Sequence, residues 1–237
     1  MYRIGPIEKA KYYIMEHSNQ GKKEIERNTA GPCITISRET GARADKISEL
    51  LIEIFNKIDG TAHWAVFDKN IIEKVLQDHH LPHTLEKLME EKKYPAMKSL
   101  MNELLVGQPS VWSLVHKTTE TILQLAAIGN AIILDRGANI ITAKLPNTFH
   151  VRLVAPLENR IFHVQELYNF DKKEALDFVR REDADRKEYL MNYFHKEITD
   201  PLIYNIIINT GQLTDEECAE IIRQAVFKKL GTSFSNN

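Results

Sequence analysis

Five short apolar segments constrain the fold of this chain more than any other feature of its sequence. They occupy residues 33–37, 64–67, 131–134, 150–155 and 204–209. Each is too short for a typical helix and rich in residues that favour strands. Helical patterns separate them, and no hairpin turn joins one to the next. The sequence therefore predicts an α/β fold with a five-stranded parallel sheet that carries helices on both faces.

Length and charge limit the class of protein. The chain has 237 residues, with 31 Lys and Arg against 33 Asp and Glu. We expect one domain over residues 31–230, preceded by an N-terminal arm (1–30) and followed by a polar tail (231–237). A near-neutral charge argues against general binding to nucleic acid or to a membrane surface. The two cysteines are far apart, and no membrane span or signal peptide is evident, so a cytoplasmic protein is expected.

The first apolar segment leads through a short loop into an amphipathic helix. A strand that turns directly into a helix N-terminus aims backbone N–H groups and the positive end of the helix dipole at one point, which suits a phosphate. The loop nevertheless departs from the usual phosphate loop, GxxxxGK[ST]. Gly41 is its only glycine, and the residues after it are Ala42, Arg43, Ala44, Asp45 and Lys46.

Polar residues follow the other predicted strands. Asp68 comes after the second strand, Asp135 and Arg136 after the third, and Asn209 after the fifth. Because ligands of parallel sheets bind beyond the carboxyl ends of the strands, these residues are candidates for one site.

Six motifs occur in this order along the chain: ITISRETGARADKI, VFDKNIIEKV, AIILDRGANII, HVRLVAPLENRI, DADRKEYLMNYF and DPLIYNIIINT. Together they resemble the cytidylate-kinase-like family of P-loop kinases over most of residues 31–230. The resemblance implies a nucleoside monophosphate kinase-like fold. It also implies an insertion that binds the phosphate acceptor, at about residues 69–128, and a mobile lid at about residues 165–200.

The resemblance also implies roles for individual residues. ATP would be held by the loop at Ser37, Gly41, Ala42, Arg43, Ala44, Asp45 and Lys46, where Arg43 and Ala44 replace a pair of glycines of the family. Arg38 would contact phosphate oxygens, and Arg160 would lie near the donor base. Arg136 and Asp68 would hold the acceptor, while Arg181 and Arg186 would close from the lid. Asp183 and Asp185 would position these arginines.

Asp135 has a separate candidate role. An apolar strand that ends in Asp is typical of a carboxylate that holds Mg²⁺ or its water shell. The alternative is a carboxylate that caps the next turn. Interpretations without a functional role also stay open for the basic residues. Arg38 and Lys46 could be surface charges, and Arg136 could pair with a neighbouring Asp. Arg160 and the charged residues 180–186 could lie on solvated helix faces. Asp68 has the alternative of capping the following helix.

The predicted activity is ATP-dependent phosphoryl transfer, with Mg²⁺, to a nucleoside monophosphate or a related small phosphate acceptor. The alternatives are a nucleotide-binding or sensory module that has lost turnover, favoured by the divergent loop, and a partner-binding protein on the same fold. His79, His80 and His83 lack the spacing of a metal site and are interpreted as polar residues of the insertion. The sequence leaves the acceptor and the oligomeric state open.

Overall fold

The computed structural model describes residues 9–10, 12–13, 31–59, 63–70, 72 and 113–231. Within these residues, five parallel strands form one sheet in the order β2-β3-β1-β4-β5. Their bounds are Cys33–Arg38 (β1), Ala65–Phe67 (β2), Ala131–Leu134 (β3), Thr148–Val154 (β4) and Ile206–Asn209 (β5). The predicted five-stranded parallel sheet is thus confirmed, with strand ends that differ by at most two residues from those expected.

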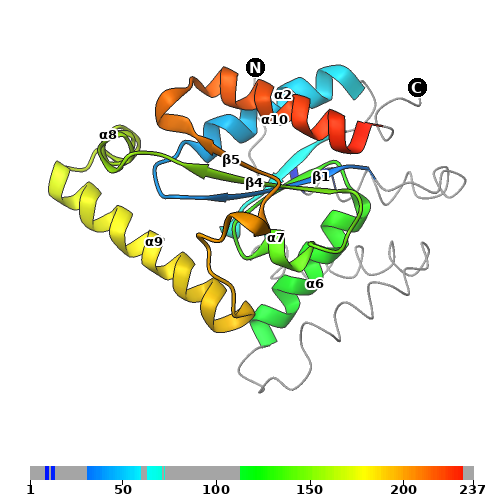
Figure 1. The fold of residues 1–237 in the computed structure, drawn as a ribbon, viewed down its shortest axis with the longest axis horizontal. Helices are drawn as coiled ribbons and strands as arrows, with labels where there is room; N and C mark the ends of the chain where they lie inside the picture. The colour runs from blue at the N-terminus through cyan, green and yellow to red at the C-terminus, as the bar shows by residue number, and fades with distance from the viewer. Residues whose placement is uncertain are drawn as a thin grey trace, which may run out of the picture.

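Helices cover both faces of the sheet (Figure 1). One face carries α2 (Ala44–Asp59) and α10 (Asp215–Leu230), and the other carries α6 (Ser113–Ile128) and α7 (Ala138–Ile141). The helices α8 (Leu157–Tyr168) and α9 (Lys172–Phe194) form a pair at one side of the sheet, and two 3₁₀ turns, η2 (Pro201–Ile203) and η3 (Thr210–Gln212), flank β5.

Side chains of β1 point alternately to the two faces of the sheet, which explains why a core forms on each face. Ile34 and Ile36 point toward α2 and α10, where they pack in a core with Ile47 and Val226. Cys33 belongs to the opposite core, which α6 and α7 complete. The strands β1, β3 and β4 are buried on both faces, so their residues read as almost continuous apolar runs, whereas the edge strand β5 is partly exposed.

The helix ends match local sequence signals. Thr214 and Glu217 form the predicted capping box at the start of α10, in which each side chain accepts a hydrogen bond from the other's backbone N–H. Asp171 and Glu174 form a second capping box on α9. Gly129 directly follows the last residue of α6, and its φ of 83° is the left-handed conformation expected of a glycine just beyond a helix C-terminus.

Several predicted segments lie partly or wholly outside the described residues. Of the N-terminal arm, only four residues are described, all helical, and Tyr13 packs edge-on against Phe67. Of the expected insertion, residues 113–128 form α6, which packs against the sheet, while residues 73–112, with His79, His80 and His83, lie outside the described residues. Within the described ranges, no helix combines the length and apolar composition that crossing a membrane requires.

Candidate functional site

A cleft of about 730 Å³ opens beyond the carboxyl ends of β1 and β3. Its walls come from the loop after β1, the turns after β2 and β3, and one face of α8 and α9. Most of the residues singled out in the sequence line it: Ser37, Arg38, Gly41, Arg43, Asp45, Asp68, Asp135, Arg136 and Arg186. The folding of the chain therefore brings together side chains that lie up to about 150 residues apart in sequence.

Asp135 lies where the loop after β1 meets α9. Its Oδ2 accepts hydrogen bonds from Nε of Arg38 at 3.2 Å and from Nε of Arg186 at 3.1 Å. Both pairs are largely shielded from solvent. One carboxylate thus holds an arginine from each side of the cleft, and Arg186 also lies near the carboxylates of Glu182 and Asp183.

The backbone at this point has an unusual conformation. Asp135, Arg136 and Gly137 have consecutive φ angles of 61°, 54° and 70°, all in the left-handed region. Asp and Gly tolerate this region, whereas Arg136 adopts it at a cost. At Gly137 a side chain is also excluded, because a Cβ would lie 2.6 Å from the ring of Phe194 at the end of α9. This tight turn presents Asp135 and Arg136 to the cleft.

Asp135 also fits the cation that the family implies. Its Oδ1 is buried and has no hydrogen-bond partner in the described part of the chain. A buried carboxylate oxygen without a donor is suited to a cation or to a water bound to it. No group of three or more His, Cys, Asp or Glu side chains suitable for a metal occurs among the described residues. Magnesium in phosphotransferases usually needs only one or two carboxylates beside the phosphates, so Asp135 alone would suffice.

The loop after β1 packs closely on the start of α8. Gly41 has a φ of 82°, and a Cβ there would collide with the carbonyl oxygen of Arg160. Both the close packing and the positive φ therefore require a glycine at this position. The side chains of Ala42 and Ala44 are fully buried in the core. The first-turn N–H groups of α2 have no intrahelical acceptor, and they belong to a segment whose residues Arg43 and Asp45 line the cleft.

Arg43 points away from the centre of the cleft. Its guanidinium donates hydrogen bonds to the carbonyl oxygens of Thr210 and Leu213, the latter at 2.7 Å. Its Nε also lies 3.2 Å from Oδ1 of Asp215, an ion pair whose geometry falls short of a hydrogen bond. Arg43 therefore ties the loop to the connection between β5 and α10.

Arg160 is likewise occupied by protein groups. Its Nη1 donates to Oδ2 of Asp183 at 2.6 Å and to the carbonyl oxygen of Thr40 at 3.3 Å. Its Nε lies 3.4 Å from Glu39 and donates to the carbonyl oxygen of Ala155. The residue is 9% exposed and does not line the cleft. It joins the loop, the start of α8 and the middle of α9.

Arg136 faces the opposite wall of the cleft. Its guanidinium carbon lies 5.3 Å from the centre of the Tyr189 ring on α9, a cation–π contact. Burial raises the pKa of Tyr189 to about 12, against the opposing effect of Arg136. Tyr189 is therefore protonated at neutral pH and can donate a hydrogen bond.

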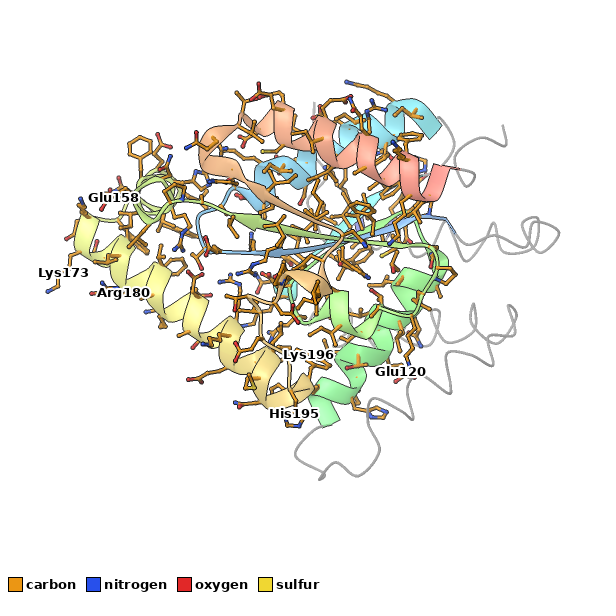
Figure 2. All side chains as sticks on the ribbon, in the orientation of Figure 1. Glu120, Glu158, Lys173, Arg180, His195 and Lys196 are labelled. Carbon is orange, nitrogen blue, oxygen red and sulfur yellow. The ribbon has the colours of Figure 1, made fainter. Side chains whose placement is uncertain are left out.

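Two further predicted residues are exposed and lie apart from the cleft. Lys46 is exposed on α2, and Arg181 has a side chain that is 62% exposed and lies over the Phe178 ring. Neither lines the cleft. The neighbouring Arg180 projects from the outer side of α9 together with Lys173 (Figure 2). The charged run of α9 thus divides into an outer solvated face and an inner face that carries Glu182, Arg186 and Tyr189.

Sequence reasoning missed two features of the site. Thr40 was not singled out, although its N–H, hydroxyl and carbonyl all contact residues of α8 or α9. Arg152 also escaped notice, because an Arg inside an apolar run of β4 resembles ordinary strand alternation. The signal for Thr40 was its place between two residues already assigned to the loop. For Arg152 the signal was a full charge in the middle of a strand predicted to be buried.

Comparison with known proteins assigns the family. A model of the cytidylate kinase-like family matches residues 33–212. The chain therefore belongs to the cytidylate kinase-like family, as its six motifs suggested. This membership indicates a nucleotide-related, kinase-like protein.

Two individual proteins are similar to parts of this chain. A crystal structure of an uncharacterised protein from Eubacterium ventriosum superposes with a TM-score of 0.66 and 20% identity, covering 83% of this chain and 98% of that one. This similarity supports the fold alone. A uronate isomerase of Corynebacterium glutamicum is 22% identical over 116 residues, which are 49% of this chain and 22% of that protein. The match spans so little of the isomerase that its activity does not bear on this chain.

Proposed function

We propose that this protein transfers a phosphoryl group from ATP to a nucleoside monophosphate or a related small phosphate acceptor. The observation that carries the proposal is the convergence on Asp135. Arg38 from the β1 loop and Arg186 from α9 meet there at the carboxyl end of β3, beside Arg136 and within one cleft. Phosphoryl transfer depends mainly on positioning and on stabilising negative charge, which is what arginines around a strand-end carboxylate provide.

Each residue has a proposed role. The N–H groups at the start of α2, with Arg38, bind the donor phosphates, and Arg136 and Asp68 bind the acceptor. Arg186 reaches over the transferring group from α9. Arg43 holds the loop in place through the β5–α10 connection, and Arg160 does so through Thr40 and Asp183. ATP supplies the phosphoryl group, and Mg²⁺ held at Asp135 neutralises charge on its phosphates.

The chemistry needs no strong base. An oxygen of the acceptor phosphate forms the new bond to phosphorus while the bond from phosphorus to the bridging oxygen of ADP breaks. The acceptor oxygen is already anionic, so no side chain has to remove a proton. Tyr189 stays protonated and orients Arg136 from the opposite wall.

The test is a coupled measurement of binding and turnover. ATP is titrated calorimetrically with and without MgCl₂, and ADP formation is then followed with a panel of monophosphates. We expect Arg136→Ala to reduce transfer by at least about a hundredfold while ATP affinity changes little, since Arg136 contacts the acceptor. Equal loss of transfer and ATP binding would refute the acceptor role.

A second candidate is a nucleotide-binding module without turnover. It is favoured by the pairing of the cleft arginines with internal carboxylates: Arg38 and Arg186 with Asp135, and Arg43 with Asp215. Charges neutralised within the protein are less available to a substrate. ATP binding without ADP formation from any acceptor of the panel would favour this candidate over the kinase.

A further inference from the structure

Arg152 is a charged residue in the interior of the sheet. It lies on β4, its in-register neighbour on β1 is Ser37, and only 5% of its surface is exposed. An arginine cannot lose its charge by deprotonation within proteins, so burial of this side chain has to be offset by contacts.

Within the part of the chain that the structure describes, Arg152 contacts only neutral groups. Its Nη1 donates a hydrogen bond to Oγ of Ser37 at 3.1 Å. Its guanidinium carbon lies 5.6 Å from the centre of the Tyr204 ring. Within the described ranges, no carboxylate lies within ion-pair distance of Arg152.

The arginines around the cleft provide the contrast. Four of them pair with an internal carboxylate although each is equally or more exposed: Arg38, Arg43, Arg160 and Arg186. The most deeply buried cation is thus the one without a matching anion in the described chain. Its Nε and Nη2 have no acceptor among the described residues, yet neither is among the fully buried polar atoms that lack a partner. These two nitrogens therefore each keep a small exposed surface, although Arg152 itself does not line the cleft.

The surroundings of Arg152 connect it to the cleft. Ser37, which accepts its hydrogen bond, lines the cleft, as does Ile198. The Tyr204 hydroxyl donates to the carbonyl oxygen of Ile198 at 2.9 Å and lies 3.3 Å from Oγ of Ser37. Arg152, Ser37 and Tyr204 form a polar cluster directly behind this part of the cleft wall.

We propose that Arg152, Ser37 and Tyr204 form an anion subsite that binds a phosphate or carboxylate group of a small ligand. The guanidinium presents parallel N–H donors that match either oxyanion. Ser37 accepts from Arg152 and lies beside the Tyr204 hydroxyl, so binding would turn the Ser37 proton from Tyr204 to the ligand. The subsite is separate from the arginines paired with Asp135, and binding there requires no phosphoryl transfer.

The experiment measures the thermal unfolding midpoint of the full chain in a buffer free of phosphate and carboxylate. Inorganic phosphate is added in one series and malonate in another, which distinguishes the two sources of the oxyanion. The variants are Arg152→Met and Arg152→Lys, with Arg223→Gln as the matched control. Arg223 lies on α10 and pairs with Glu220, away from the cleft.

We expect at least one of the two anions to raise the midpoint of the wild type and of the Arg223 variant. The shift should fall by more than half in both Arg152 variants. Arg152→Met should also be at least as stable as the wild type before anion is added, because it removes an unmatched buried charge. A full anion-dependent shift in both Arg152 variants, or no shift in the wild type, overturns the proposal.

If the Arg152 variants do not fold, anion binding can still be measured directly on the wild type. Crystals of the wild type are soaked in selenate, and the anomalous signal of selenium locates the bound anion. A peak in contact with the Arg152 guanidinium supports the subsite, and a map without one there overturns it. Both experiments are independent of ATP, so a failure of the proposed kinase activity would leave their outcome unchanged.

Discussion

The carboxylate of Asp183 on α9 accepts two hydrogen bonds from Thr40 in the loop after β1. The backbone N–H donates at 2.8 Å and the hydroxyl at 2.7 Å, both to Oδ1. Arg160 donates to the other oxygen, and Nη1 of Arg186 lies 3.7 Å from Oδ1. A carboxylate surrounded by a loop N–H, a hydroxyl and two arginines has the environment of a bound phosphate group. Asp183 therefore links α9 to the loop by contacts that a phosphate ligand would also seek.

The first prediction concerns this competition. Asp183→Asn should tighten ATP binding several-fold, because it removes a negative charge next to the loop and weakens the contact that holds α9 over it. The same change should lower the free energy of unfolding by about 1–3 kcal/mol, since Arg160 loses its closest carboxylate. Calorimetric titration and urea unfolding measure the two effects. Asp177→Asn, an exposed position on the same helix, is the control.

Unchanged or weaker ATP binding in Asp183→Asn would contradict this prediction. It would indicate that Asp183 supports the bound state, by positioning Arg160 and Arg186 for the nucleotide. The two interpretations predict opposite changes in ATP affinity, so a threefold change in that affinity in either direction is sufficient to separate them.

The sequence predicted the sheet well because its signal is local. Each strand is a short β-rich run, and the third was placed at residues 131–134, where β3 lies. The same holds for helix ends such as the capping box at Thr214. Of the strand-end residues expected to share one site, Asp68, Asp135 and Arg136 line the cleft, since parallel topology brings the carboxyl ends of strands to one edge. Asn209 does not line it, because its side chain caps the 3₁₀ turn after β5.

The directions of individual side chains could not be predicted. Arg43 contacts the β5–α10 connection, and Thr40 contacts Asp183 from 143 residues away. Such pairings depend on how close the folded elements come, which no local pattern encodes. Arg181 and Arg186 look alike in sequence, but the helical phase of α9 places one outside and the other inside.

The second prediction tests Arg43 as an anchor of the loop. Arg43→Gln and Asp215→Asn should each lower the free energy of unfolding by about 1–2 kcal/mol, and the double variant should cost little more than the worse single one. The reason is that the Arg43–Asp215 ion pair is lost in all three. ATP affinity should change by less than about threefold, because the guanidinium points away from the cleft centre.

The opposite pattern would assign Arg43 to the ligand. Additive stability losses, together with a tenfold or greater loss of ATP affinity in Arg43→Gln alone, would mean that its guanidinium leaves Asp215 and contacts phosphate when nucleotide binds. Urea unfolding and calorimetry on the four proteins of the cycle separate the two cases.

The third prediction concerns magnesium at Asp135. Asn tolerates the left-handed backbone there and preserves the shape, so Asp135→Asn removes mainly the charge. We expect magnesium to tighten ATP binding by about tenfold in the wild type and by less than about twofold in this variant. Asp185→Asn, which alters a carboxylate that lines the cleft from α9, should keep the full magnesium effect. Equal magnesium effects in Asp135→Asn and the wild type would exclude Asp135 as the ligand.

The fourth prediction concerns His150, which lies on β4 and is 7% exposed. Burial, with a smaller contribution from Lys229, lowers the pKa of His150 from 6.5 to about 4. The neutral ring is 2.8 Å from the Thr35 hydroxyl through Nδ1. In the unfolded chain the same imidazole binds a proton near its ordinary pKa. Between pH 6.5 and 4 the unfolded state therefore holds a proton that the folded state lacks.

Stability should accordingly fall as the pH drops through this window, by roughly 3 kcal/mol for a shift of this size, and the contribution should level off below about pH 4. His150→Gln should show a shallower decline over the same range, whereas His116→Gln, at an exposed position on α6, should follow the wild type. Urea unfolding at half-unit pH steps measures the slopes. A decline in His150→Gln as steep as that of the wild type would place the acid sensitivity in other groups.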